Sequence, residues 1–356
     1  MRRRTFSDAQ LAMSQSRQTG SLPAGHGGDD TSGDFRLHYS GRHVLVTGGL
    51  GFLGLNLVTH LCRAGALVRV LQHASADSRA DQLPLLKEVE RVTGDIRDSE
   101  AVRRALVACD TVFNLAGRSG AIASNASPFD DLDVNLRGQL TLLETCRQHA
   151  PGIKVVFPSS RLVYRPHTPI PVPESAPTYP ISMYGIHKLA GENYHLLYDR
   201  LHHIHAVILR VTNPYGPLQR RDQDRYGIVN WFIHRAVRGL DLPVYGNGEQ
   251  LRDYVHVNDV MAAFLMAGAN PAANGMIFNV GSGQGVSFMD MGKHVVEVAG
   301  GAVVRKIEWP AEAAAVETGD FVADIALIEK VLGWRPRVEL VEGINDVVLS
   351  YQSFMS

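Results

Sequence analysis

The feature that most constrains this chain is a regular alternation, from residue 41 onwards, of short β-branched runs with longer helical stretches. This alternation is typical of repeated βαβ units, in which parallel strands are joined by helices. We therefore expect an α/β fold with a doubly wound parallel sheet. The predicted strands are residues 43–47, 66–71, a run ending at 92–93, 111–117, 154–160 and 206–211. The predicted helices are residues 52–64, one beginning near 98 or 99, 129–149 and 182–201.

The two ends of the chain differ from this central region. Residues 1–40 begin with three arginines and continue as a Ser-, Gln-, Gly- and Asp-rich stretch without hydrophobic periodicity, which predicts a disordered tail. No apolar segment follows the arginines, so a secretory signal is not expected. The later part of the chain is irregular, with helices near 228–238 and 258–269. We expect residues 41–212 to form the first domain and 213–356 mainly a smaller, mixed substrate-binding lobe, segments of which can return to the first domain.

Composition and charge argue against several classes of protein. Lys and Arg number 35 against 36 Asp and Glu, so no net basic field is available for nucleic acid. No apolar run reaches the roughly 18 residues that span a bilayer, so we expect no membrane segment. Cys62, Cys109 and Cys146 are too far apart for a CxxC pair, and so few cysteines indicate a reducing compartment, for which we expect the cytoplasm. No carboxylate or cysteine cluster accompanies the histidines, so we expect no metal site.

The segment TGGLGFLG lies between the first predicted strand and its helix, and its glycines have separate roles. Gly48 permits a tight turn, Gly51 lets the backbone approach a pyrophosphate, and Gly54 lets the helix pack close to the sheet. The helix then begins with Phe52 and Leu53, where unpaired N–H groups and a partial positive charge favour phosphates. The position of the motif in a βαβ unit predicts a dinucleotide-binding domain of the Rossmann type.

Two polar residues at strand ends bear on the choice of dinucleotide. The usual fingerprint has an acidic residue about 20 positions after the glycines, which bonds the adenosine ribose of NAD. Gln72 occupies that place, and an amide neither repels a 2′-phosphate nor attracts one. We expect NAD as cofactor, while NADP stays open. Asp95 follows the third strand and is either a hydrogen-bond acceptor for the adenine amino group or a turn-capping residue.

A proton-transfer group is predicted at Tyr184, Lys188 and Ser160. The tyrosine and the lysine stand four residues apart in a predicted helix, so their side chains share one face. A free tyrosine has a pKa near 10, and a neighbouring ammonium favours its anion. The serine ends the fifth strand, at the carboxyl edge where open α/β sheets bind ligands. Its hydroxyl can share a hydrogen bond with the oxygen that is being oxidised.

These motifs together resemble the extended short-chain dehydrogenase/reductase family, in particular its NAD-dependent nucleotide-sugar epimerase/dehydratase branch. The resemblance covers residues 41 to about 336. It is carried by TGGLGFLG, GDIRD, NLAG, PSSRLVY, YGIHK, LRVTNPYGP, EQLRDYVHVNDV, NVGSG and LGWRP, in that order. It implies a Rossmann fold with a substrate lobe, a nucleotide-diphosphate sugar as substrate, and catalysis by Ser160, Tyr184 and Lys188. It also implies that the two long helices pair with a second subunit in a homodimer, although their apolar residues can equally face the sheet.

The remaining candidate residues follow from the same motifs. The predicted cofactor-binding residues are Gly48, Gly51, Phe52, Leu53, Gly54, Gln72, Asp95, Ile96, Leu115, Ala116, Gly117, Asn135, Tyr184 and Lys188. The predicted substrate-binding residues are Ser160, Arg161, Asn213, Arg252 and Asp320. Arg252 has an independent rationale, because a guanidinium matches phosphate oxygens; its alternative is a surface salt bridge with Asp253.

Three positions depart from the family pattern. Arg161 and Leu162 stand where 4,6-dehydratases have an Asp–Glu pair, so the usual acid and base for water loss are absent. Arg165 replaces a customary glycine, and Glu317 stands where the family often has arginine. We therefore expect a nucleotide-sugar epimerase that acts at carbon 4 through a 4-keto intermediate. The alternatives are a 4-ketoreductase or a dehydratase and, in another class, a non-catalytic dinucleotide-binding sensor or scaffold.

Overall fold

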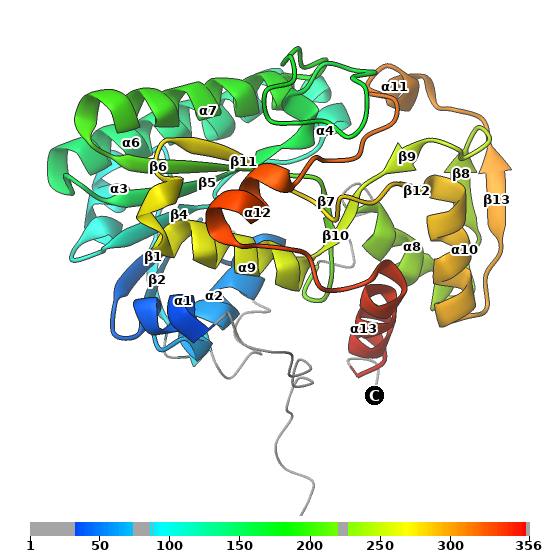
Figure 1. Cartoon of the computed structure of the whole chain (residues 1–356), viewed down its shortest axis with the longest axis horizontal. Helices are drawn as coiled ribbons and strands as arrows, with labels where there is room; N and C mark the ends of the chain where they lie inside the picture. Colours follow the sequence, from blue (N-terminus) through cyan, green and yellow to red (C-terminus); the bar gives the residue numbers. More distant parts are fainter. Residues whose placement is uncertain (1–32, 74–85, 88, 220–226, 354–356) are drawn as a thin grey trace, which may run out of the picture. The chain divides into compact units, whose positions relative to one another are not determined.

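The predicted strands form a central seven-stranded sheet in which every neighbouring pair is parallel (Figure 1). The structure is a computed structural model that describes residues 33–73, 86–87, 89–219 and 227–353. The strand order is β11-β6-β5-β4-β1-β2-β3. The strands are β1 (His43–Thr47), β2 (Leu67–Gln72), β3 (Glu90–Thr93), β4 (Thr111–Asn114), β5 (Lys154–Ser160), β6 (His205–Val211) and β11 (Met276–Val280). The order reverses direction at β1, next to β4, and such a switch point is where doubly wound sheets bind ligands.

Helices cover both faces of this sheet, as a doubly wound fold requires. One core contains apolar side chains of α2 (Phe52–Arg63), α9 (Val257–Ala269) and α12 (Ala326–Leu332). The core on the opposite face contains side chains of α3 (Ser99–Leu106) and α6 (Gly138–His149). Figure 1 shows α3, α6 and α7 on one side of the sheet and α2 and α9 on the other. The prediction of a Rossmann-type, doubly wound parallel sheet is confirmed.

A third core lies beyond the carboxyl ends of the strands and belongs to the later part of the chain. Its helices are α8 (Ile228–Ala236), α10 (Phe288–Ala299) and α13 (Leu340–Ser353), and they pack beside β8 (Leu242–Tyr245) and β13 (Val304–Ile307). The other short elements here are β7 (Asn213–Tyr215), β9 (Leu251–Arg252), β10 (Tyr254–His256), β12 (Val286–Ser287) and α11 (Ala311–Ala314). Two segments of the same part of the chain belong to the main sheet instead: β11 extends it beside β6, and α9 packs against it.

The predicted helix over 129–149 is wrong as a single helix. The segment forms α5 (Pro128–Leu132), a π-helical turn (Asp133–Arg137) and α6. A π-turn widens the backbone by one residue, and such turns occur mostly at functional sites. Here it contains Asn135, whose amide reaches out of the helix to hydrogen-bond the backbone of Arg118.

Two further predicted bounds need correction. The strand expected over 111–117 ends at Asn114, because residues 115–117 leave the sheet to form a loop. The predicted tail over 1–40 extends too far, because Gly33–Tyr39 form α1. Tyr39 is fully buried and its hydroxyl donates to Leu265 O at 2.8 Å, so this segment is fixed by contacts that no local pattern reveals. Residues 1–32 lie outside the described residues. The chain divides into two units, Met1–Asp34 and Phe35–Ser356, and every element after α1 belongs to the second.

Candidate active site

The glycine turn between β1 and α2 allows two close backbone approaches. Gly48 has φ +64°, and a Cβ atom there would lie 2.8 Å from the backbone nitrogen of Ala116. A Cβ at Gly54 would lie 2.3 Å from Gly48 O, so only glycine lets the helix approach the turn. Gly51 precedes α2 in an extended conformation, and no side chain caps the helix. The first N–H groups, from Phe52 onwards, are therefore available to a phosphate.

The end of β2 presents an acceptor without a donor. Gln72 is half-buried, and its Oε1 atom is buried with no hydrogen-bond partner among the described residues. An orphaned acceptor of this kind costs free energy unless a ligand donates to it. A ribose hydroxyl at this strand end would do so, and the residues of the turn and the strand therefore fit a dinucleotide.

Asp95 is engaged within its own turn. Arg97 donates to Oδ1 through its backbone N–H at 2.8 Å and through Nε at 2.9 Å, and Nη2 reaches Oδ2 at 2.7 Å. These hydrogen bonds lower the pKa of Asp95, so it stays ionised. These contacts are the ones expected if Asp95 is a turn-capping residue. Ile96, the next residue, is buried and contacts Gly138 at the start of α6.

The loop after β4 is fixed by a buried amide network. Asn114 accepts from Thr47 Oγ1 at 2.9 Å and donates to Gln139 Oε1 at 2.5 Å. Gln139 in turn donates to Ala116 O at 3.1 Å, and the Ala116 N–H donates to Thr47 Oγ1 at 3.0 Å. The network holds residues 115–117 against the glycine turn. Sequence reasoning missed Thr47 and Gln139, since their hydroxyl and amide groups match this loop only in the folded chain.

Gly117, the last residue of that loop, lies between two candidate residues. A Cβ atom there would lie 2.8 Å from Asn135 Oδ1 and 4.0 Å from Lys188 Nζ. Leu115 packs on the core of the α2 face. The structure therefore brings the NLAG loop, the π-turn and α7 (Met183–His202) to one place.

The start of α7 is held tightly against the residues that follow β5. Ser182 caps the helix, with its side chain accepting from Gly185 N at 3.2 Å. A Cβ atom at Gly185 would lie 2.5 Å from Leu162 O, so the helix approaches that turn as closely as glycine permits. The Tyr184 N–H donates to Ser124 Oγ at 3.0 Å. These contacts place the tyrosine beside Ser160, whose hydroxyl accepts from Leu162 N at 3.2 Å.

The electrostatics of the group depend on burial. Lys188 Nζ donates to Pro158 O at 2.8 Å and lies 5.7 Å from the centre of the Tyr184 ring. Burial lowers the pKa of Lys188 to about 8, which leaves it mostly protonated at neutral pH. Burial raises the pKa of Tyr184 to about 12, while its hydrogen bond with Ser160 acts in the opposite direction. The arrangement is a phenol flanked by a hydroxyl and an ammonium, as proton transfer to and from an alcohol requires.

A buried hydrogen-bonded His–Asp pair that the sequence did not reveal lies beside this group. His187 Nδ1 and Asp131 Oδ1 are 2.6 Å apart, and both side chains are almost fully buried. Asp131 Oδ2 accepts from Asn135 Nδ2 at 3.0 Å. The Asp131 charge raises the pKa of both Tyr184 and Lys188. No local signal identifies the pair, because its members are 56 residues apart.

Three of the predicted substrate residues, Asn213, Arg252 and Asp320, lie in β9 or contact residues in or next to it. Asn213 Nδ2 donates to Asp253 O at 2.9 Å, and Asp320 Oδ1 accepts from Leu251 N at 2.8 Å, so both are engaged in local structure. Arg252 is buried, donates to two backbone carbonyls and forms an ion pair with the half-buried Glu317. The alternative of a surface salt bridge between Arg252 and Asp253 is wrong. Asp253 is buried and instead accepts hydrogen bonds from the backbone N–H groups of Ser282, Gly283 and Ala323.

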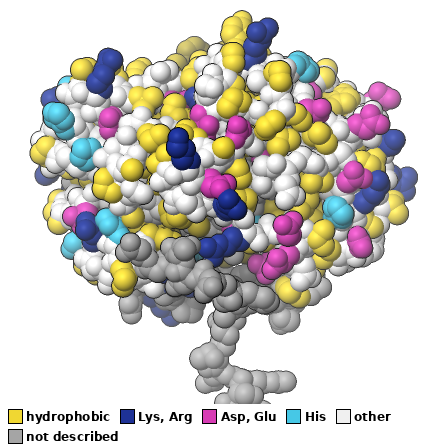
Figure 2. Space-filling view, in the orientation of Figure 1, with side chains coloured by type: hydrophobic (Ala, Val, Ile, Leu, Met, Phe, Trp, Pro, Cys, Tyr) yellow, Lys and Arg dark blue, Asp and Glu magenta, His cyan; other side chains and the backbone are white. Residues whose placement is uncertain are grey.

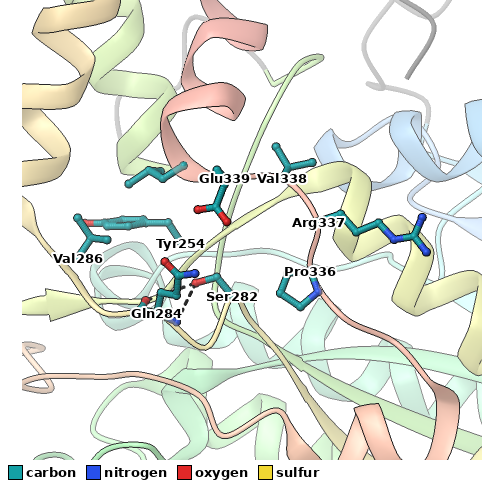
Figure 3. Close-up of a pocket in the computed structure, with 9 residues that line it drawn as sticks. Tyr254, Ser282, Gln284, Val286, Pro336, Arg337, Val338 and Glu339 are labelled. Atoms are coloured by element: carbon teal, nitrogen blue, oxygen red, sulfur yellow. Dashed lines mark hydrogen bonds between the residues drawn. The ribbon is translucent and has the colours of Figure 1, made fainter. Parts of the chain in front are cut away.

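A small cavity of about 50 Å³ is not lined by the candidate catalytic residues. In Figure 3 the ring of Tyr254 lies beside Val286 on one side of this cavity, and Arg337 points away from it. Ser282 and Gln284 are joined there by hydrogen bonds, one of them 3.2 Å long. None of Ser160, Tyr184 and Lys188 lines the cavity.

The described residues contain neither a metal-binding cluster nor a membrane-spanning helix. No three of their His, Cys, Asp and Glu side chains form a group suited to a metal ion. Within the same residues, no helix has the length and apolarity to cross a membrane. On the face shown in Figure 2, basic and acidic side chains are interspersed.

Comparisons with known proteins show which family this chain is similar to. The model of the NAD dependent epimerase/dehydratase family matches residues 44–281. A UDP-glucose 4-epimerase from Mycolicibacterium smegmatis is 33% identical over 314 residues, which cover 86% of this chain and 97% of that protein. The structure is similar to that of the Thermotoga maritima UDP-glucose 4-epimerase with UDP-glucose, with a TM-score of 0.80, 29% identity and coverage of 88% of this chain and 100% of that one.

A further solved structure is the Thermus thermophilus UDP-glucose 4-epimerase in complex with NAD. It has a TM-score of 0.76 and 32% identity, and the match covers 87% of this chain and 99% of that one. The resemblance drawn from the sequence motifs is thereby confirmed. With its doubly wound sheet, its glycine turn and a family match over more than half its length, this chain belongs to the NAD dependent epimerase/dehydratase family.

Proposed function

We propose that this protein is an NAD-dependent nucleotide-sugar epimerase that inverts carbon 4 through a transient 4-keto sugar. The observation that carries the proposal is the position of Tyr184, between the Ser160 hydroxyl and the Lys188 ammonium, at the carboxyl end of β5. The solved relatives with UDP-glucose and with NAD support the same substrate class and cofactor.

The chain's own residues supply the proton transfer. Tyr184 removes the proton of the C4 hydroxyl, and Ser160 shares a hydrogen bond with that oxygen as it becomes a carbonyl. Lys188, held by Pro158 O, supplies the positive charge that favours the phenolate. Bound NAD would supply the reversible hydride acceptor for C4. Rotation of the keto sugar presents its other face, and Tyr184 then gives the proton back.

The cofactor would be held by the groups on the inner edge of the sheet. The N-terminus of α2 and the glycine turn receive the pyrophosphate, and Gln72 Oε1 accepts from the adenosine ribose. The Lys188 ammonium and the loop at Gly117 lie together, where the nicotinamide end would bind. Gln72 carries no positive charge to attract a 2′-phosphate, which favours NAD over NADP.

The alternative functions would use the same fold for other purposes. A 4-ketoreductase shares the three catalytic residues but consumes cofactor, so net oxidation of NADH or NADPH distinguishes it from an epimerase. A 4,6-dehydratase needs an acid and a base next to Ser160, and Arg161 and Leu162 supply neither. A sensor or scaffold without catalysis has no need of a buried ammonium beside a phenol.

We also propose that the protein acts as a homodimer. The outer face of α7 carries exposed apolar side chains at helical spacing, namely Met183, Ile186, Leu197 and Leu201. Leu140 of the neighbouring α6 is exposed as well. Burying such a stripe against a second copy would remove apolar area from water. Location in the cytoplasm remains a prediction, which rests on the scarcity of cysteines.

The test of the proposed function is Tyr184→Phe. The wild-type protein is incubated with NAD and a panel of UDP-, dTDP-, CDP- and GDP-linked hexoses and hexuronates, and C4 epimers are separated by chromatography. We expect the variant to lose turnover by at least about 1,000-fold while it still binds NAD, because only the phenolic oxygen is removed. Tyr179→Phe is the matched control, since Tyr179 is 69% exposed and five residues away. Full activity in Tyr184→Phe would refute the assignment.

A further inference from the structure

Next to the catalytic serine the structure places a guanidinium that has no carboxylate partner. Arg161 is half-buried and directly follows Ser160. Its Nη1 donates to Thr318 Oγ1 at 2.9 Å, and its guanidinium lies 5.5 Å from the centre of the Phe321 ring. No acidic side chain among the described residues forms an ion pair with it. Burial lowers the pKa of Arg161 to about 9, and repulsion from Arg252 acts in the same direction.

The acidic groups nearby are already engaged. Glu317 forms its ion pair with Arg252, and its carboxylate also accepts from Gly319 N at 2.9 Å. Asp253 accepts from backbone N–H groups. Arg252 is therefore paired with Glu317, and neither Glu317 nor Asp253 forms an ion pair with Arg161. A half-buried, unpaired cation is costly unless an anionic ligand completes it.

The position of Arg161 along the chain indicates which part of the substrate it meets. In the proposed reaction, Ser160 and Tyr184 hold the hydroxyl at C4 of the sugar. The Cα atom of Arg161 is about 3.8 Å from that of Ser160. On a pyranose ring C5, which bears C6, is the neighbour of C4, whereas the diphosphate is attached at C1 on the opposite side. The Arg161 backbone therefore lies on the C4 side of the sugar, nearer to C5 and its C6 substituent than to the diphosphate, and the guanidinium extends from there to Thr318 and Phe321.

We propose that the substrate is a nucleotide-activated hexuronate whose C6 carboxylate is bound by Arg161. This inference rests on the proposed function, since it uses C4 as the reacting carbon. A carboxylate matches the planar guanidinium in a bidentate pair, which a neutral hydroxymethyl group cannot form. The Thr318 hydroxyl and the Phe321 ring keep the guanidinium in place, so Arg161 determines specificity and takes no part in proton transfer.

The test compares UDP-glucuronate with UDP-glucose, which differ only at C6, as substrates of the full-length protein with NAD. We expect the wild type to have the higher kcat/KM with UDP-glucuronate. Arg161→Gln should lower that value about 10- to 100-fold, mainly through KM, because a charged hydrogen-bonded pair is lost. It should change kcat/KM for UDP-glucose less than about threefold. Arg161→Lys, which keeps the charge, should recover part of the loss.

Controls separate binding from folding. Arg103→Gln removes an exposed arginine of α3 and should leave both substrates unaffected. Thermal unfolding of each variant shows whether the fold is retained. An equal loss with both substrates in Arg161→Gln would mean that the diphosphate is the bound anion, and it overturns the inference. Preference of the wild type for UDP-glucose also overturns it but leaves the proposed epimerase intact. Absence of turnover with both sugars in every nucleotide series overturns the proposed function as well.

Discussion

At the scale of single residues, the pKa of the Tyr184 phenol depends on a charge that lies outside its own motif. Asp131 is buried beside His187 and raises the pKa of Tyr184 by making its anion less favourable. Asp131→Asn should therefore lower the pKa of Tyr184 and move the acidic limb of the kcat–pH profile to lower pH. The profile is measured from pH 5 to 9 with saturating substrate.

The neighbouring aspartate provides a matched control for that experiment. Asp130 is exposed and forms a surface ion pair with Arg118. Asp130→Asn should leave the pH profile unchanged, because solvent screens its charge. An unchanged profile in Asp131→Asn, with the fold retained, would show that the buried carboxylate has no influence on the phenol.

At the scale of the element, α7 is held on β5 by buried polar groups whose protonation limits stability in acid. His195 is fully buried, stacks on Phe157 at 4.3 Å and is joined by hydrogen bonds to Gly191 O and Asn114. Burial lowers its pKa to about 4, against about 6.5 in the unfolded chain. The unfolded state thus binds a proton first, and stability falls as pH decreases from about 6.5 to about 4.

This difference gives a measurable pH dependence. Between pH 7 and pH 5, His195 should contribute about 2 kcal/mol to the loss of unfolding free energy. Urea unfolding at the two pH values should show a smaller loss in His195→Gln than in the wild type. His149→Gln, at the exposed end of α6, should lose as much as the wild type. The same loss in His195→Gln and wild type would exclude His195 as the source.

At the scale of the whole molecule, the exposed apolar stripe on α7 predicts the oligomeric state. We expect the wild type to sediment as a dimer at micromolar concentration, and Ile186→Glu combined with Leu197→Glu to shift it to monomer, because charges in a buried interface are costly. Val341→Glu combined with Leu349→Glu, on the exposed face of α13, is the matched control and should leave the dimer intact. A wild-type monomer at these concentrations contradicts the proposed dimer.

Local patterns in the sequence determined the sheet, the glycine turn, and the Tyr184–Lys188 pair, because these follow from the periods of strand and helix and from the conformational freedom of glycine. The tertiary structure alone decided which distant side chains meet: Asp131 with His187, and Glu317 with Arg252, 65 residues apart. It also decided that the helix over 129–149 contains a π-turn. Such pairings depend on how loops pack at the carboxyl edge of the sheet, and no periodicity along the chain encodes that packing. The tertiary structure therefore also decided that Glu317 pairs with Arg252 and leaves Arg161 without a carboxylate partner among the described residues.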